Sequence, residues 1–150
     1  MKIYLGTDHA GFELKEKIKS FLLEKGYEIE DCGAFEFNKD DDYPDFISKT
    51  AIKVSQKPSS IGIIFGKSGA GENIVANKID GIRSILGINA ENVELSRLDN
   101  DANVLSLGSL FTNKELAKQL VEIFLNTKFT SEDRHIRRIN KIKEIEKNQT

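Results

Sequence analysis

An unbroken apolar run followed at once by a glycine-rich segment is the feature that most constrains the fold of this chain. Residues Ile61–Phe65 read IGIIF, and residues Gly66–Glu72 read GKSGAGE. A strand that is apolar at every residue has both faces covered, as happens when helices lie on either side of a parallel sheet. The two segments therefore predict a buried strand that ends in a tight turn and leads into a short helix.

Short apolar segments alternate with amphipathic ones along the rest of the chain. Further strands are expected at Lys2–Thr7, Tyr27–Asp31, Arg83–Ile88 and Asn103–Leu107, and a loop at 35–45. The 3.6-residue period predicts helices at about 11–26, 46–56, 72–78, 90–98, 112–126 and 131–147. Thr112 and Glu115 predict a capping box for the fifth of these helices. The alternation predicts an α/β fold whose parallel sheet of five strands has helices on both faces.

Size and composition are those of one globular domain spanning residues 1–150. The chain is 39% hydrophobic and 31% charged with a net charge of −2, so we expect it to bind neither nucleic acid nor a membrane. No apolar stretch approaches the roughly 18 residues of a membrane-spanning helix, and the N-terminus lacks the apolar core of a signal peptide. Cys32 is the only cysteine, which fits a reducing compartment. We therefore expect a cytoplasmic protein.

Ligands of parallel α/β sheets bind at the edge where the strands end. By this rule we expect the site in the segments Thr7–Gly11, Gly66–Glu72 and Asp99–Asn103. The three glycines of the second segment let main-chain N–H groups converge, and the helix start behind them favours an anion. A turn that needs its glycines only for geometry is the alternative.

The glycine-rich segment matches neither common nucleotide-binding motif. A GxxxxGKS phosphate loop would need glycine at position 61, which is Ile61. A GxGxxG motif starting at Gly69 would need glycine at position 74, which is Ile74. Because both spacings fail, a flavodoxin-like nucleotide-binding module is disfavoured.

Three polar side chains at the expected edge are candidates for chemistry. Glu72 lies at a helix start, where it either acts as a base beside the converging amides or only complements the helix dipole. Asp8 and His9 follow the first strand, and either hold sugar hydroxyls or a phosphate, or serve as an N-cap and a solvent-facing histidine. The chain has two histidines, His9 and His135, and no Cys/His cluster with zinc spacing, so no metal site is expected.

The last predicted helix carries a basic cluster. Arg134 and Arg138 lie one helical turn apart and project from the same face, a spacing that suits the oxygens of a phosphate. The alternative is a solvated basic face that forms ion pairs between subunits. Since this helix has few apolar residues, we expect it to lie on a surface or to reach a second subunit.

Six segments spread over nearly the whole chain carry a resemblance to a known family. They read GTDHAGFELK, DCGA, DDYPDF, GKSGAGENIVANK, SRLDNDANVLSLGS and RHIRRI, at residues 6–15, 31–34, 41–46, 66–78, 96–109 and 134–139. Together they resemble the ribose-5-phosphate isomerase B family, which also includes galactose-6-phosphate isomerase subunits. The resemblance implies a Rossmann-like three-layer α/β/α fold without cofactor or metal. It also implies a homodimer or dimer of dimers, with the C-terminal helix at the interface and the active site between subunits.

The reaction implied by the resemblance interconverts ribose 5-phosphate and ribulose 5-phosphate through a cis-enediolate, in the pentose phosphate pathway. One branch of the family uses a cysteine base at the position of Gly66, and the other uses a glutamate that matches Glu72. Glu72 is therefore the expected base, and Ser68 with the amides of Gly69 to Gly71 would form the enediolate hole. The implied substrate contacts are Asp8, His9, Tyr43, Gly66, Lys67, Gly69, Ala70, Gly71, Asn100, Arg134 and Arg138.

Two positions depart from the family pattern. The family's ring-opening histidine corresponds to Asp99, which at an ordinary pKa of about 3.9 is a poor acid at neutral pH. A phosphate-contacting arginine of the family corresponds to Leu110. These departures leave two alternatives open. One is an isomerase of a six-carbon sugar phosphate, such as allose or galactose 6-phosphate, and the other is a non-catalytic phosphosugar-binding protein of the same fold.

Overall fold

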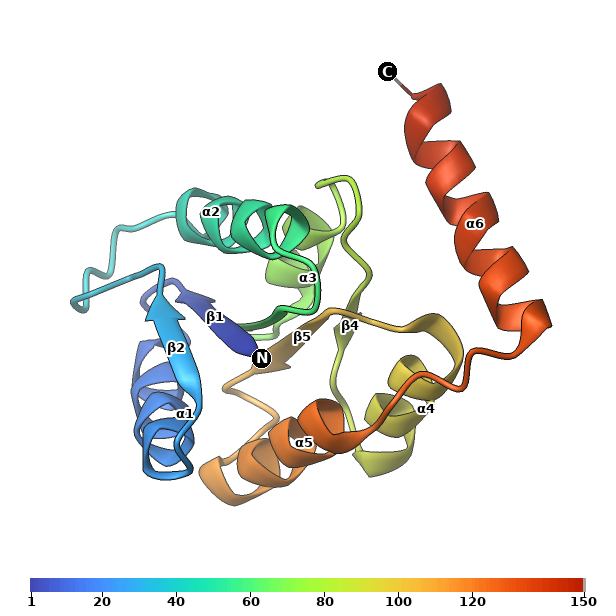
Figure 1. Cartoon of the computed structure of the whole chain (residues 1–150). Coiled ribbons are helices and arrows are strands. Elements are labelled where there is room, and N and C mark those ends of the chain that lie inside the picture. The colour runs from blue at the N-terminus through green and yellow to red at the C-terminus, as the bar shows by residue number, and fades with distance from the viewer. Residues whose placement is uncertain (150) are drawn as a thin grey trace.

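A five-stranded parallel sheet forms the centre of the computed structural model, which describes residues 1–149 (Figure 1). Its strands lie in the order β2-β1-β3-β5-β4, and every neighbouring pair is parallel. The strands are β1 (Lys2–Thr7), β2 (Glu28–Asp31), β3 (Ile61–Gly66), β4 (Ser84–Leu86) and β5 (Val104–Gly108). The helices are α1 (Phe12–Glu24), α2 (Tyr43–Gln56), α3 (Ala70–Ala76), α4 (Ala90–Asn100), α5 (Lys114–Asn126) and α6 (Asp133–Asn148). The expected α/β fold with its parallel sheet is confirmed.

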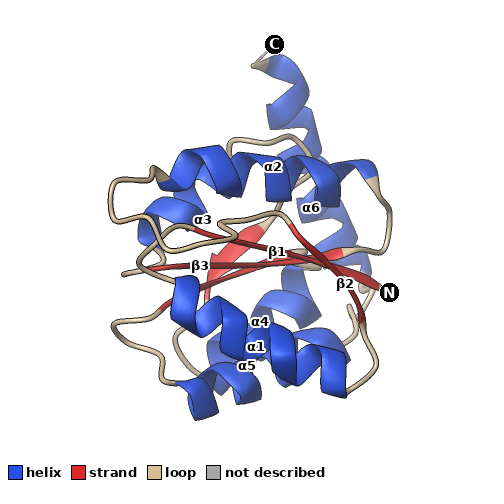
Figure 2. Ribbon diagram, turned by 90° about the vertical axis from the view of Figure 1, so that its left-hand side faces the viewer, coloured by secondary structure: helices blue, strands red, loops and turns tan. Residues whose placement is uncertain are grey.

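Helices cover the sheet on both faces, as Figure 2 shows. Helices α1, α4 and α5 lie on one face, and α2 and α3 lie on the other. Strand β3 is central, and all six of its residues are buried. Within β3, Ile63 and Phe65 point into the core beneath α1 and α5, whereas Ile64 points toward α2 and α3. The unbroken apolar sequence of β3 thus results from burial on both faces.

Three local expectations differ from the structure. The N-cap of α5 is Asn113, whose side chain accepts from the amide of Leu116 at 2.9 Å. Thr112 instead belongs to the preceding turn, because its amide donates to Gly108 O at 2.9 Å; the predicted capping box is wrong. Helix α2 already begins at Tyr43, since Pro44 in a first turn requires no helical N–H partner. Strand β4 is also shorter than expected.

Helix α6 extends away from the three layers (Figure 1). The segment before it is fixed to the end of α4, because the amide and hydroxyl of Thr130 both donate to Leu98 O, at 3.1 and 3.0 Å. Within α6, Ile139 is buried, while other isoleucines of the helix are exposed: Ile136, Ile142 and Ile145. None of the helices in the described chain has the length and apolarity to cross a bilayer.

Candidate active site

The loops that follow β1, β3 and β5 meet at one edge of the sheet. Thr7 ends β1 and donates from its hydroxyl to Phe65 O at 3.1 Å, so the ends of β1 and β3 are tied together. After β5, the amide of Ser109 donates to Gly66 O at 2.8 Å, and its hydroxyl donates to Ala10 O at 2.9 Å. The segments Thr7–Gly11 and Gly66–Glu72, which the sequence singles out, therefore lie side by side.

The glycine-rich loop between β3 and α3 has a fixed shape. Gly69 adopts a left-handed conformation with φ of 78°, which favours glycine. Its carbonyl accepts from the hydroxyl of Ser106 at 2.7 Å. The amide of Ala70 donates to Ser68 Oγ at 3.2 Å, whereas the amides of Gly69 and Gly71 have no acceptor within residues 1–149. Two unpaired main-chain donors thus remain in the loop that contains the predicted enediolate hole.

Glu72 lies in the first turn of α3 and is only 4% exposed. Its carboxyl group packs against the α-carbon of Gly66, where an added Cβ would overlap it. Burial raises the pKa of Glu72, its own amide opposes this rise, and the nearby Asp8 carboxylate raises the pKa further. No ion pair to Glu72 is formed by the part of the chain that is described. A buried carboxylate without a counter-charge accepts a proton readily, as a general base must. A glutamate that only complements the helix dipole would be expected to lie exposed, so the burial of Glu72 favours the base.

Asp8 and Tyr43 lie beside this carboxylate. Asp8 is buried, and its Oδ1 accepts from the amides of Ala10 and Gly11 at 3.0 and 3.3 Å. The Tyr43 ring packs against Gly71, where an added Cβ would lie 2.8 Å from Cζ and 3.0 Å from the hydroxyl oxygen. Of the other predicted contacts, Lys67 and Ser68 are exposed on the loop. The structure therefore brings Asp8 and Tyr43 to Glu72, and leaves Lys67 and Ser68 facing solvent on the preceding loop.

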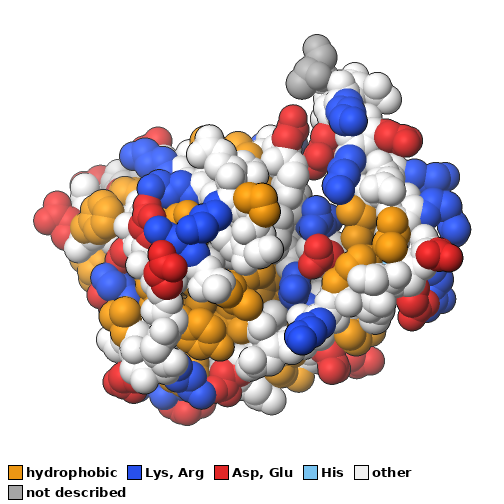
Figure 3. All heavy atoms as spheres, in the orientation of Figure 1, with side chains coloured by type: hydrophobic (Ala, Val, Ile, Leu, Met, Phe, Trp, Pro, Cys, Tyr) orange, Lys and Arg blue, Asp and Glu red, His pale blue; other side chains and the backbone are white. Residues whose placement is uncertain are grey.

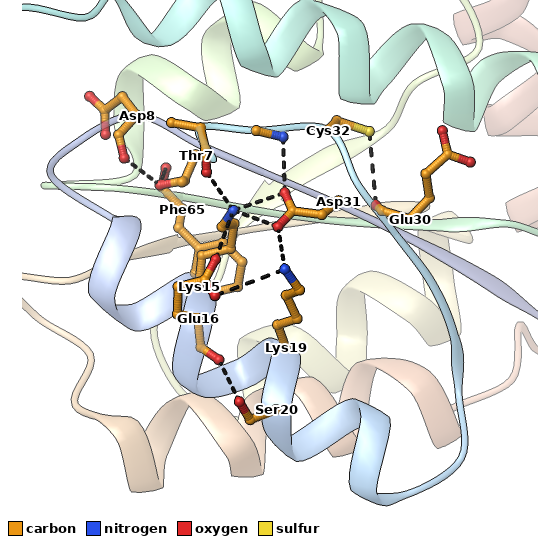
Figure 4. Close-up of polar contacts among 12 residues, drawn as sticks. Thr7, Asp8, Lys15, Glu16, Lys19, Ser20, Glu30, Asp31, Cys32 and Phe65 are labelled. Atoms are coloured by element: carbon orange, nitrogen blue, oxygen red, sulfur yellow. Dashed lines mark hydrogen bonds and ion pairs between the residues drawn. The ribbon is translucent and has the colours of Figure 1, made fainter. Parts of the chain in front are cut away.

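A buried ion pair supports the end of β1 from the side of β2 (Figure 4). The fully buried Nζ of Lys15 donates to both oxygens of Asp31 at 2.8 Å and to Ala34 O at 2.6 Å. Burial disfavours ionisation of Asp31, but hydrogen bonds from Lys15 and Lys19 hold its pKa below the ordinary value. The amide of Thr7 donates to Gly33 O at 2.8 Å. The pair thus fixes the turn that holds β1 immediately before Asp8.

His9 makes a contact that the sequence reasoning missed. Its Nδ1 lies 2.6 Å from Asp41 Oδ1, and its amide donates to the same oxygen at 3.0 Å. The hydrogen bond that His9 makes to the Asp41 carboxylate raises the pKa of His9 above its ordinary value of 6.5, against the effect of burial. The sequence offers one indirect signal, the acidic run ahead of Tyr43, but no pattern tells which acid would meet a histidine 32 positions away.

Asp8, His9 and Asp41 also form the one group of three within residues 1–149 whose possible metal-ligand atoms all lie within 4.8 Å of one another. Oδ1 of Asp41 is already used by two hydrogen bonds from His9, and Oδ1 of Asp8 by two amides. The two Oδ1 atoms therefore belong to a hydrogen-bonded cluster formed within the chain.

The third expected segment lies elsewhere. Asp99 and Asn100 end α4 and precede β5, which starts at Val104, so they lie at the amino edge of the sheet, opposite Glu72. The expectation that Asp99–Asn103 joins the carboxyl edge is wrong for a single chain. The reason is that this segment enters a strand, whereas the other two leave one.

Arg134 and Arg138 lie on the same side as Asp99. The buried His135, 4% exposed, places Nε2 at 3.5 Å from Asp99 Oδ1, which brings the start of α6 to the end of α4. Arg134 and Arg138 are exposed on the same helix, and Arg134 donates to Glu132 at 2.9 Å. Figure 3 shows Lys and Arg side chains gathered along α6. One chain therefore holds two groups of predicted site residues at opposite edges of its sheet.

Comparison with known proteins gives a consistent result. A ribose-5-phosphate isomerase B of Mycolicibacterium paratuberculosis is 41% identical over 147 residues, covering 98% of this chain and 92% of the relative. The enzyme of that name from Escherichia coli is 38% identical, with 97% and 96% covered.

Solved structures agree with these relatives. Ribose-5-phosphate isomerase B of Clostridium thermocellum superposes with a TM-score of 0.93 at 40% identity, over 100% of both chains. That of Mycoplasma genitalium, with bound ribulose-5-phosphate, gives a TM-score of 0.93 at 35% identity over 97% of this chain and 96% of the other. Residues 3–142 match the Ribose/Galactose Isomerase family as a whole. With a match of this extent and relatives of about 40% identity, the chain belongs to the Ribose/Galactose Isomerase family.

Proposed function

We propose that this protein interconverts ribose 5-phosphate and ribulose 5-phosphate, with Glu72 as the base. The observation that carries the proposal is the buried Glu72 carboxylate, which has a raised pKa and packs over Gly66 beside the free amides of the glycine-rich loop. The names of the relatives and the ribulose 5-phosphate bound to the Mycoplasma genitalium protein support the choice of substrate.

The reaction moves one proton between adjacent carbons. In the open-chain aldose, Glu72 removes the proton on C2, the electrons of that bond form the C1–C2 double bond, and O1 becomes anionic. A proton then moves from O2 to O1, which gives the enediolate form of the ketose. Glu72 returns its proton to C1 while the C2–O2 carbonyl forms. A carboxylate whose pKa is raised by burial holds a proton more readily, which suits both halves of this transfer.

The charge that develops on the sugar oxygens requires hydrogen-bond donors. The amides of Gly69 and Gly71 and the hydroxyl of the exposed Ser68 are donors within four residues of Glu72. Fixed donors of this kind stabilise an oxyanion by preorganisation. Asp8, His9 and Tyr43 surround the same place and would hold the sugar hydroxyls and phosphate.

We also propose that each active site is completed by a second copy of the chain. Arg134 and Arg138 suit a phosphate, but they lie with Asp99 and Asn100 at the edge away from Glu72. Helix α6 extends from the body and exposes Ile142 and Ile145, which an interface would cover. A two-fold dimer would bring the α6 of one subunit to the Glu72 edge of the other, in both directions at once.

A cytoplasmic location is part of the proposal. Cys32 is the only cysteine, so the chain has no internal disulfide. Burial raises the pKa of the Cys32 thiol, so it has little thiolate character at neutral pH. Such a thiol is compatible with the reducing conditions in which sugar phosphates are metabolised.

A coupled assay tests the proposed function. Ribose 5-phosphate is supplied beside allose 6-phosphate and galactose 6-phosphate, with and without a metal chelator. We expect the highest kcat/KM with ribose 5-phosphate and no effect of the chelator. A higher kcat/KM with a six-carbon substrate would favour the alternative that Leu110 and Asp99 suggest, an isomerase of a six-carbon sugar phosphate. Binding of these sugar phosphates without turnover would contradict an isomerase.

A further inference from the structure

Asp41 holds His9 by two hydrogen bonds to a single oxygen. The amide and Nδ1 of His9 lie 3.0 and 2.6 Å from Asp41 Oδ1. One bond fixes the backbone of the loop after β1, and the other fixes the rotation of the imidazole ring. A segment 32 residues along the chain thus sets the orientation of a side chain at the carboxyl edge of the sheet.

The carboxylate of Asp41 lies in a place where a charge needs a partner. Its side chain is only 8% exposed, and its second oxygen is buried without a hydrogen bond from any described residue. No lysine or arginine within residues 1–149 pairs with it. Since a buried carboxylate is costly without a counter-charge, a protonated His9 is the cation that this site provides.

The other charged groups that face His9 act in the same direction. Asp8, on its own loop, and Asp40 and Asp41, on the segment before α2, all favour the imidazolium form. The uncharged ring of Phe37 also meets the imidazole, edge-on with the centroids 6.0 Å apart. Burial alone opposes protonation, and His9 retains 32% exposure. Three acids therefore raise the pKa of His9, and no cation among the described residues is seen to lower it.

The free nitrogen of His9 is the one available to a ligand. With Nδ1 engaged by Asp41, Nε2 has no hydrogen-bond partner in the part of the chain that the structure describes. In the imidazolium form Nε2 carries a proton and can only donate. A donor with a positive charge suits an anionic oxygen of a sugar phosphate.

We propose that Asp41 is a positioning residue that fixes His9 with Nδ1 engaged and Nε2–H directed to the substrate. His9 then meets the sugar phosphate as a cationic donor. This inference rests on the proposed function, in which His9 contacts the substrate. Asp8 has a different task, because its carboxylate is held by the amides of Ala10 and Gly11.

The test compares Asp41→Asn with Asp42→Asn. Asparagine at 41 keeps an oxygen for the His9 amide but removes the charge, and the neighbouring Asp42 is exposed and makes no side-chain hydrogen bond to cap α2. NMR titration is simple because the chain has only two histidines, and His9→Gln assigns the signals. We expect the pKa of His9 to lie above 6.5 in the wild type, to fall in Asp41→Asn and to stay unchanged in Asp42→Asn.

The same variants have a kinetic signature. The alkaline limb of the kcat/KM profile for ribose 5-phosphate should move to lower pH in Asp41→Asn by as much as the His9 pKa falls. At a pH between the alkaline limb of Asp41→Asn and that of the wild type, kcat/KM of the variant should be about tenfold lower than that of the wild type. This is the effect of losing one charge-assisted hydrogen bond to the substrate. In a His9→Gln background, Asp41→Asn should cause no further loss.

Two results would overturn the assignment. One is an unchanged His9 pKa in Asp41→Asn; the other is an equal loss of kcat/KM from Asp41→Asn with and without His9, as expected of a merely structural residue. Failure of the proposed function is a separate outcome. If the wild type turns over no sugar phosphate, the assay fails, but the NMR titration still shows whether Asp41 controls the charge of His9.

Discussion

The carboxyl group of Glu72 lies directly against the α-carbon of Gly66, in the space that a Cβ at position 66 would occupy. Gly66 ends the central strand, and Glu72 lies in the first turn of α3. The carboxylate of Glu72 fits there because Gly66 has no side chain. Any residue larger than glycine at 66 is incompatible with the observed position of Glu72.

Gly66→Ala should therefore displace the Glu72 carboxylate while every other predicted site residue is retained. We expect kcat to fall by at least about 100-fold, since a general base contributes about 10² to 10⁴. Gly62→Ala is the matched control on the same strand, where the added Cβ would meet Val104 and Val54 at 3.0 and 3.1 Å. It should cost about 1 kcal/mol of stability and leave kcat near the wild-type value. Full activity in Gly66→Ala would disprove the relationship.

Glu72→Gln should stabilise the fold at neutral pH. The pKa of Glu72 is raised mainly by burial, so the folded state favours the protonated form and loses stability as pH rises through the folded-state pKa. Glutamine has no such loss. Urea denaturation should give a higher free energy of unfolding for the variant at pH 7 and equal values below the unfolded pKa of about 4.5. A variant less stable than the wild type at pH 7 would show that ionised Glu72 is well solvated or paired.

Asp31→Asn should destabilise the protein strongly. It removes the buried anionic partner of the fully buried Lys15 ammonium and leaves only the partly exposed Glu16 carboxylate, 3.1 Å away. Breaking a buried ion pair on one side costs about 3–5 kcal/mol. Glu13→Gln, which breaks the exposed Glu13–Lys17 pair, is the control and should change little. The measurement is thermal or urea unfolding of both variants. Equal effects would mean that the Lys15–Asp31 pair does not support the fold.

Mixed dimers test whether a site is shared between subunits. Glu72→Gln and Arg138→Ala should each be nearly inactive alone. If one subunit supplies Glu72 and its partner supplies Arg138, half of the dimers in an equal, reassociated mixture are mixed, and each has one intact site. The mixture should therefore recover about a quarter of wild-type activity. No recovery, with mixed dimers verified by mass, would place both residues in one chain's site.

The sheet and the glycine-rich loop could be predicted because local sequence determines them. The apolar run at 61–65 predicts a strand covered on both faces, and β3 is such a strand. The turn after it requires a left-handed conformation at position 69, where the sequence has glycine. The predicted positions of Glu72 and Asp8 followed from the ends of β1 and β3. These are consequences of short-range pattern plus one rule of parallel sheets.

Other parts of the site depended on contacts that no pattern encodes. The pairing of Asp41 with His9 arises from how the 35–42 segment folds back to the loop that follows β1. The sequence does not tell a polar segment that enters a strand from one that leaves it, and Asp99 lies in a segment that enters β5. Residues that act across a subunit boundary cannot be placed by the topology of one chain.

The central claim is that Glu72 carries the proton between C1 and C2. Its most direct test follows ribose 5-phosphate in D₂O by NMR, measuring both ribulose 5-phosphate formation and deuterium entry at C1 for the wild type and Glu72→Gln. We predict that the variant loses both rates by at least about 100-fold, while a phosphosugar acid analogue still binds with similar affinity. Isomerisation and deuterium entry at wild-type rates in Glu72→Gln would contradict the account.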